Sequence, residues 1–151
     1  LIVIMASLTV WAAVRGFTNK EELDKSKGCL DLLIKNEVLL NEDYTCYNQS
    51  GNEFHFSISI GNVDLDELVI LINSPEESRS YKLNKNPYSE GNLLNYSRGA
   101  TGLIVPSKNS GRTFIATGIS NKPDSVEIAP RIKDHQCEIS DSIEFIYSCE
   151  T

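Results

Sequence analysis

The chain has 151 residues and a formal net charge of −7, with 40% apolar and 23% charged residues. This length suits one domain with a core of its own plus an appendage. The 14 basic residues form no cluster. The composition therefore argues against nucleic acid and anionic membrane surfaces as partners, because phosphate groups are bound by clustered lysines and arginines.

The first seventeen residues, "LIVIMASLTVWAAVRGF", carry a single charge, at Arg15. Apolar side chains occupy twelve of the first fourteen positions and would surround a helix, which must then be buried in lipid or among other helices. Seventeen helical residues would span about 25 Å, slightly less than the roughly 30 Å apolar core of a bilayer. The candidate residues of this assembly segment are Leu1, Ile2, Val3, Ile4, Met5, Ala6, Leu8, Val10, Trp11, Val14 and Phe17.

Three interpretations of this segment are open. A signal peptide would carry basic residues before its apolar stretch, and none precedes Leu1. A signal anchor is expected to begin with Met and a basic flank. In the third interpretation, which the missing Met favours, a basic leader has been removed and the apolar segment stays in the mature protein.

Helix-forming residues continue beyond the apolar segment. Glu21 and Lys25 stand four residues apart, a spacing that supports a solvated helix, and Gly28 is a natural helix end. We expect one helix of about 27 residues, apolar at its start and polar at its end. The predicted domains are an N-terminal assembly helix over 1–28 and a globular domain over 29–151.

The rest of the chain shows the patterns of β-strands. Residues 54–60 alternate strictly between apolar and polar, as in a half-buried antiparallel strand. The continuously apolar stretch 68–72 is typical of a central strand covered on both faces. Further strands are expected at 29–40, 112–117 and 142–149, and less clearly at 102–105.

Residues 125–133 also alternate, with Val126, Ile128, Pro130 and Ile132 facing inward. Proline lacks an N–H group, so this strand is expected at a sheet edge or bulged at Pro130.

Turn signals separate these strands. Residues 48–52 and 133–136 are typical of hairpin connections, and the polar stretch 73–102 is expected to be a long surface loop. The predicted fold class is α+β, a long N-terminal α-helix followed by an Ig-like antiparallel β-sandwich.

Four widely spaced cysteines suit two disulfides and an oxidising, exported setting, with four buried thiols as the alternative. Pairing Cys29 with Cys149 and Cys46 with Cys137 would tie the two ends of the sandwich together and is preferred. The local pairing, Cys29 with Cys46 and Cys137 with Cys149, stays open. Two N-glycosylation sequons, at Asn48 and Asn95, lie in polar, turn-like stretches and add support for export.

The sequence predicts no catalytic residue, metal ligand or cofactor. His55 and His135 suit ordinary surface positions, and the acidic stretch 61–67 lacks the spacing of a calcium loop. Five tyrosines fall in or near predicted loops, where they suit either adhesion and domain contacts or unremarkable exposure: Tyr44, Tyr47, Tyr81, Tyr88 and Tyr96.

An apolar N-terminal segment, a polar continuation and a small β-sandwich together resemble the archaeal type IV pilin-like proteins, the wider family that includes archaellins. The opening "LIVIMASLTVWAAVRGF" carries most of the resemblance. The closing stretch 123–149 is similar to the last strands of some cysteine-bearing pilins. Met5 stands where bacterial pilins usually have glutamate, a departure that points to the archaeal branch.

The resemblance implies a precursor cut just before the apolar segment, held in the membrane by that segment and then assembled into an extracellular filament. The helices would pack in the filament core, and the β-domains would face outward for adhesion. The partner would be further copies of the chain, and the precursor would sit in the membrane through residues 1–17. The alternative is a monomeric, membrane-anchored β-sandwich that binds a ligand or partner; a motility filament is less favoured.

Overall fold

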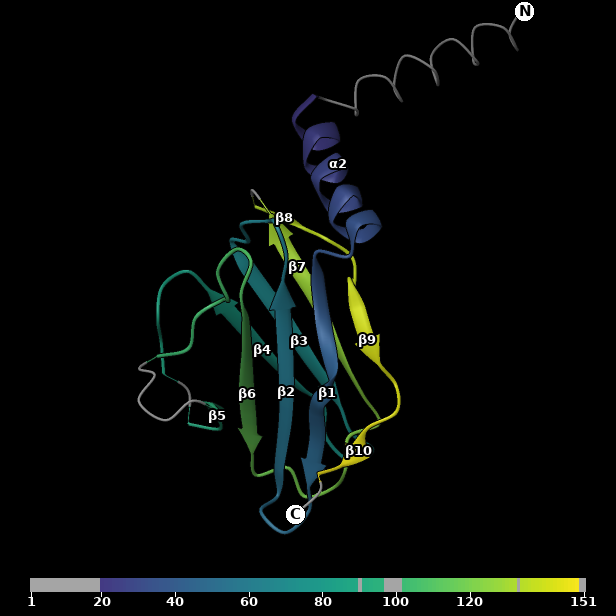
Figure 1. The fold of residues 1–151 in the computed structure, drawn as a ribbon, viewed down its shortest axis with the longest axis vertical. Coiled ribbons are helices and arrows are strands. Elements are labelled where there is room, and N and C mark those ends of the chain that lie inside the picture. Colours follow the sequence, from purple (N-terminus) through teal and green to yellow (C-terminus); the bar gives the residue numbers. More distant parts are fainter. Residues whose placement is uncertain (1–19, 90, 97–101, 133, 150–151) are drawn as a thin grey trace, which may run out of the picture.

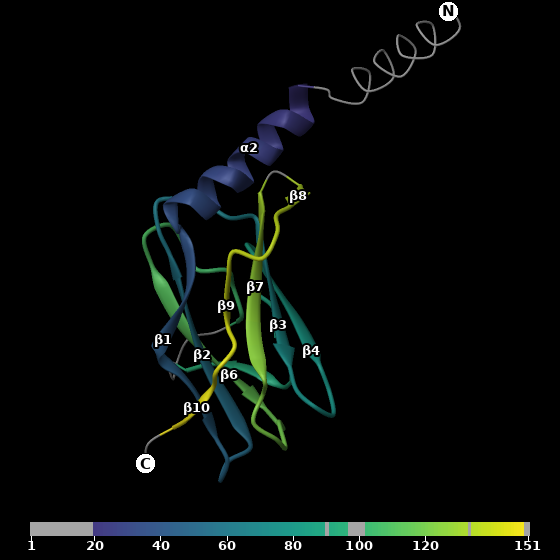
Figure 2. The same ribbon diagram turned by 90° about the vertical axis from the view of Figure 1, so that its right-hand side faces the viewer.

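A computed structural model describes residues 20–89, 91–96, 102–132 and 134–149. Two β-sheets pack face to face, and a helix leaves one end of the sandwich (Figures 1 and 2). The elements are α2 (Lys20–Lys35), β1 (Val38–Asn48), β2 (Glu53–Ile60), β3 (Glu67–Asn73), β4 (Arg79–Asn84), β5 (Leu93–Asn95), β6 (Gly111–Thr117), β7 (Ser125–Ile132), β8 (His135–Gln136), β9 (Asp141–Ile143) and β10 (Tyr147–Ser148).

The first sheet has the strand order β10-β1-β2-β6-β5. Its long β1 and β2 are joined by a hairpin at the end of the sandwich opposite α2 (Figure 1). The second sheet has the order β4-β3-β7-β8, and β9 also pairs with β7. The short β10 lies parallel to β1, with Cys46 opposite Tyr147.

The core lies between the two sheets and follows from the alternation of each strand. Phe54, Phe56 and Ile58 of β2 turn inward and are fully buried, and the alternate residues of β3 and β7 face them. The Phe56 ring stacks on Phe54 at 5.7 Å and on Phe114 at 5.6 Å between centroids. Three stacked rings from two neighbouring strands therefore fill the centre of the first sheet's inner face.

The strands predicted at 54–60 and 112–117 are confirmed as β2 and β6. The strand at 125–133 is confirmed as β7, with Val126, Ile128 and Pro130 buried. It is not an edge strand, because β3 pairs with it along its length on one side and the short β8 and β9 pair with parts of it on the other. Between β8 and β9, the carbonyl of Pro130 accepts a bond from Cys137 N. The position without an N–H group therefore faces the side of β7 that is paired only in part.

Residues 68–72 form part of the strand β3, but the prediction that this strand is covered on both faces is wrong. Leu68, Ile70 and Ile72 are buried in β3, but Val69 and Leu71 on the outer face are only half-buried. The described residues place no layer over that outer face. The apolar run therefore leaves an apolar stripe on the outside of the second sheet.

The predicted fold class is wrong. The described part of the chain is mostly β, and its helix is the 16-residue α2. The parallel β1–β10 pair also makes the first sheet mixed where an antiparallel sandwich was expected. Residues 1–19 of the predicted N-terminal helix lie outside the described residues.

The helix end predicted at Gly28 is also wrong, because α2 continues through it to Lys35. Residues 29–35 of the expected strand at 29–40 are therefore helical. Asn36 ends the helix with a φ of 52°, and Glu37 N donates to Leu32 O at 3.1 Å. This is the Schellman ending, with asparagine in the left-handed position that glycine more often takes. The domain boundary at 28/29 accordingly falls inside a helix.

The expected long loop at 73–102 contains β4 and β5. The strand at 142–149 divides into β9 and β10, and at 102–105 the structure has a single bridge, between Leu103 and Tyr88. The hairpin predicted at 48–52 is confirmed, with Asn52 at a φ of 53°. The connection near 133–136 also joins a hairpin, β7 to β8, but His135 and Gln136 belong to β8.

Candidate functional site

The candidate residues of the assembly segment, Leu1 to Phe17, lie outside the described residues. Among the helices that the structure describes, none is long and apolar enough to cross a bilayer. The described element nearest to that segment is α2, which points away from one end of the sandwich (Figure 2).

The last two turns of α2 are fixed to the sandwich. Cys29 and Leu32 are buried in the core, and Cys29 is bonded to Cys137, which follows β8. The Schellman bond from Glu37 to Leu32 then sets the angle at which the chain enters β1. A covalent bond, a buried leucine and a defined helix end together hold this part of α2 in place.

The outer face of the same two turns is apolar and uncovered. Leu30 is 55% exposed and Ile34 is 68% exposed. Residues four apart lie on one face of a helix, so these two side chains form one stripe. A helix that exposes large aliphatic side chains in this arrangement presents an apolar surface to a partner.

Both disulfide pairings considered from the sequence are wrong. The bonds are Cys29–Cys137 and Cys46–Cys149, the third of the three possibilities. The reason is the length of β1, which separates Cys29 at the α2 end from Cys46 at the opposite end (Figure 1). Each cysteine then meets the C-terminal cysteine at its own end. The prediction of two disulfides is itself confirmed, and no free cysteine occurs among the described residues.

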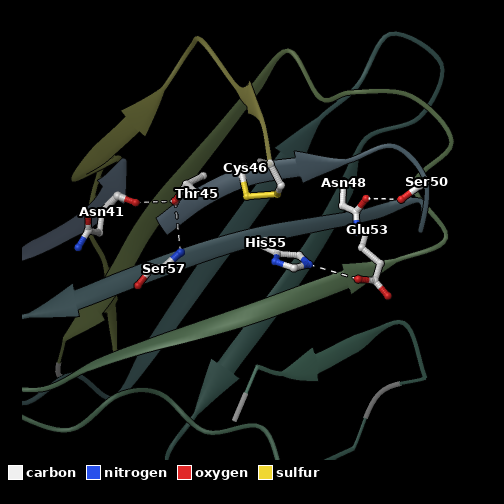
Figure 3. The surroundings of a disulfide bond; sticks show 9 residues. Asn41, Thr45, Cys46, Asn48, Ser50, Glu53, His55 and Ser57 are labelled. Carbon is white, nitrogen blue, oxygen red and sulfur yellow. Dashed lines mark hydrogen bonds and ion pairs between the residues drawn. A yellow bond between two sulfur atoms is a disulfide. The ribbon is translucent and has the colours of Figure 1, made fainter. Parts of the chain in front are cut away.

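The Cys46–Cys149 bond lies beside His55, which is the register partner of Cys46 on β2 (Figure 3). One ligand atom from each of these three residues lies within 4.8 Å of the others. Both sulfur atoms are committed to the disulfide and are not thiolate ligands. His55 is half-buried rather than on the open surface, and its Nε2 pairs with Glu53 Oε2 at 3.2 Å. With the disulfide formed, Cys46, His55 and Cys149 therefore pack against one another and do not provide a set of metal ligands.

The two sequons differ in their surroundings. Asn48 ends β1, and its Oδ1 accepts a bond from Ser50 Oγ at 2.8 Å at an exposed position. Asn95 lies on β5, and its Nδ2 donates to Gly102 O at 2.7 Å. Glycosylation occurs at the amide nitrogen, which in Asn95 is already engaged with the backbone. Asn48 is therefore the more suitable acceptor of the two.

The remaining polar candidates take part in ordinary contacts. Lys85 Nζ lies 3.1 Å from Asp64 and 3.4 Å from Asp66, and Lys82 pairs with Glu67 at 3.5 Å. Hydrogen bonds to the two aspartates raise the pKa of Lys85, so it stays cationic above the usual range for lysine. Lysines thus balance the acidic stretch.

His135 is half-buried in β8 rather than placed in a turn. The tyrosines divide into two groups. Tyr47 and Tyr81 are core residues, and the Tyr47 hydroxyl donates to Ile119 O at 2.6 Å. Tyr44 and Tyr96 are exposed, while Tyr88 packs partly buried against the core.

Sequence reasoning missed an aromatic pair near the C-terminus. Phe145 and Tyr147, here called the aromatic knob, are 67% and 62% exposed, and their rings meet edge to face at 5.3 Å. The sequence predicts a strand at 142–149, and a regular strand buries every second residue. Instead Ile143 and Ile146, three apart, are buried, which breaks the period of two. That irregular spacing was the available signal.

Sequence reasoning also missed a shallow, widely open apolar depression on the outer face of the second sheet. We call it the sheet hollow. Val69 of β3 and Ala129 of β7 are register partners at its base. It is lined by Val69, Ala129, Gln136, Cys137, Glu138 and Ile139.

No protein-family model matches this chain, and a comparison with curated proteins finds no match either.

Proposed function

We propose that this protein is a structural subunit of an extracellular type IV pilus-like filament. The apolar residues 1–17 of many copies would pack together inside the filament, and the β-sandwich would face outward for adhesion or surface contact. Before assembly the same segment would hold the subunit in a membrane. The sandwich supplies a rigid outer body, and the proposal assigns it no catalytic step.

The observation that carries this proposal is the apolar stripe of Leu30 and Ile34 on α2. This helix lies between the apolar segment and the sandwich, and its last turns are fixed to the sandwich by Cys29–Cys137. Association of the apolar segments would bring several copies of α2 close together. The exposed stripe would then be covered by neighbouring subunits, which burial of aliphatic side chains favours by about 1.5–3 kcal/mol each.

The placement of α2 and of the Asn48 sequon at opposite ends of the outer domain also supports the proposal. The hairpin that bears Asn48 lies at the end of the sandwich opposite α2 (Figure 1). If the α2 end faces the filament interior, a sugar on Asn48 would project into solvent. Two disulfides, each spanning more than 100 residues of sequence, suit an oxidising extracellular setting.

Negative-stain electron microscopy of the purified full chain tests the proposal. We expect uniform long filaments for the natural sequence and none for Ile4→Asp, which would bury an unpaired charge in the packed segment. The variant's disulfides and far-ultraviolet circular dichroism should stay unchanged. Dispersed particles of the natural sequence in detergent would overturn the proposal and favour a monomeric, membrane-anchored binding protein.

A further inference from the structure

The aromatic knob is held in a fixed position. Ile143 and Ile146, on either side of Phe145, are anchored in the core. Just beyond Tyr147, Cys149 is bonded to Cys46, and its N–H donates to Tyr47 O at 2.9 Å. The two exposed rings therefore project from a backbone that is fixed on both sides. Preordered aromatic side chains of this kind lose little entropy on binding, and they commonly dominate protein interfaces.

The knob also carries a positive charge. Lys122 lies in the connection before β7, and its Nζ stands 5.7 Å from the centre of the Phe145 ring. Lys122 is exposed. A partner for this surface should combine an apolar recess with a carboxylate at its rim.

The sheet hollow has that combination. Its base is apolar, from Val69, Ala129 and Ile139, and Ile139 remains 51% exposed. Glu138 lines it and is exposed to solvent. Gln136 is held at its side, because its amide nitrogen lies 3.4, 3.1 and 3.2 Å from the carbonyls of Ala129, Pro130 and Cys137 and shares its two N–H groups among them.

The knob and the hollow lie toward opposite ends of the sandwich. Ile143, just before the knob, pairs with Val126 at the start of β7. Gln136 of the hollow pairs with Arg131 at the end of β7, the end near α2 (Figure 2). One copy therefore cannot place its own knob in its own hollow. A contact between two different patches of identical copies builds an open helical array wherever the rotation from copy to copy does not close a ring.

We propose that the aromatic knob of one copy docks in the sheet hollow of the next copy, with Lys122 of the first copy facing Glu138 of the second. This inference takes its occupant, a second copy of the chain, from the proposed function. Charge complementarity favours this occupant as well. The chain carries a net charge of −7, so copies repel one another, and a lysine–glutamate contact at the docking surface opposes that repulsion locally.

Photo-cross-linking of the full assembled chain tests the contact directly. A benzophenone amino acid replaces Phe145 in one preparation and Tyr96 in the other. Tyr96 is a matched aromatic control, because it is 58% exposed and follows β5, at the opposite edge of the first sheet from β10. We expect position 145 to form adducts between copies that map by mass spectrometry to peptides containing Ala129 or Glu138–Ile139. Adducts that map elsewhere, or none, overturn the inference.

A charge exchange gives a second measurement. Lys122→Glu and Glu138→Lys should each weaken association of the subunits about threefold, and the double variant should restore it. The cross-linked preparations are also viewed by electron microscopy. Filaments without the adduct from position 145 to the sheet hollow would overturn this inference and leave the proposed function standing. Adducts without filaments would overturn the proposed function and leave the contact between copies standing.

Discussion

Gly28 has the lowest helix propensity of any residue type in α2. It stands inside α2, and a methyl group placed on it would meet no atom within 4 Å. Glycine in a helix loses more backbone freedom on folding than alanine does, at a cost of about 0.5–1 kcal/mol. The position therefore has room for a stabilising side chain.

We expect Gly28→Ala to raise the free energy of unfolding by about 0.5–1 kcal/mol, because it removes that entropic cost. Urea unfolding followed by circular dichroism measures this. Gly102→Ala is the matched control and should destabilise, since Gly102 has a φ of +82° and the new Cβ would lie 2.7 Å from Pro87 Cβ. An unchanged midpoint for Gly28→Ala would contradict the expected gain, and a lower midpoint would show that α2 needs glycine at this position.

The two sequons provide another contrast between single residues. When the chain is expressed with export through a glycosylating pathway, we expect sugar on the Asn48 peptide and none on the Asn95 peptide, measured by peptide mass spectrometry. Sugar on Asn95 would compete with its bond to Gly102 O. Asn95→Gln should accordingly lower the free energy of unfolding by about 1 kcal/mol even without sugar, whereas Asn48→Gln should leave it unchanged. Full occupancy at Asn95 with normal stability would contradict this reading of its surroundings.

Among single residues, sequence alone predicted the inward positions well and the cysteine partners badly. Phe54, Phe56 and Ile58 follow from a period of two, which is a local property of the strand. The partner of a cysteine depends instead on which end of the sandwich it occupies. Cys29 and Cys46 are close in sequence, and an 11-residue strand carries them apart.

At the scale of elements, the two disulfides secure different parts of the fold. Cys29–Cys137 joins α2 to the segment after β8, and Cys46–Cys149 joins β1 to the end of the chain. The second bond matters for β10, which has only two residues and pairs with β1 alone in the first sheet. A strand that short has little hydrogen bonding of its own to stay docked.

Replacing either pair of cysteines by serine should lower the free energy of unfolding by on the order of 4–5 kcal/mol, as expected for loops of about 100 residues. Hydrogen exchange should distinguish the two variants. Loss of Cys46–Cys149 should speed exchange at the β1–β10 pair and leave α2 unchanged. Loss of Cys29–Cys137 should speed exchange in the last turns of α2 and spare β10. The same uniform acceleration in both variants would show that the bonds do not act locally.

Elements with a strong local pattern were predictable, and elements defined by their neighbours were not. The strand β2 alternates cleanly and was placed almost to the residue. The strand β4, "RSYKLN", buries only Tyr81 and Leu83 at the edge of its sheet, so its sequence resembles a polar loop. The end of α2 was missed because Asn36 makes the turn that glycine was expected to make.

For the whole molecule, the Leu30–Ile34 stripe is the exposed apolar surface that the proposed assembly covers. We expect the double variant Leu30→Asp/Ile34→Asp to raise the subunit concentration needed for filament formation at least about tenfold, because it removes apolar burial between subunits. Sedimentation of filaments at a series of concentrations measures this. Asp31→Asn/Lys35→Gln is the matched control, since both residues are exposed on the same two turns of α2. Equal sedimentation of both variants would show that the stripe is not an assembly surface.

The two-sheet architecture was predictable from the number and spacing of strands, but the fold class was not. Most of the residues that made the sequence appear α+β lie outside the described part of the chain, and that part is mostly β. The sheet hollow was not predictable, because it combines residues of different elements, such as Val69 of β3 and Ala129 of β7. The aromatic knob left a signal in the spacing of Ile143 and Ile146, but its contact with Lys122 joins segments far apart in the sequence.

The connectivity of the disulfides also orders events during biosynthesis. Cysteines 29 and 46 leave the ribosome first, and their proper partners are the last two to appear. While about 90 further residues are synthesised, the thiols of Cys29 and Cys46 can form a disulfide only with each other, and that bond is absent from the folded protein. Correct maturation of this protein therefore depends on an oxidant that acts after Cys149 has emerged, or on a catalyst that rearranges the non-native bond between the two early cysteines.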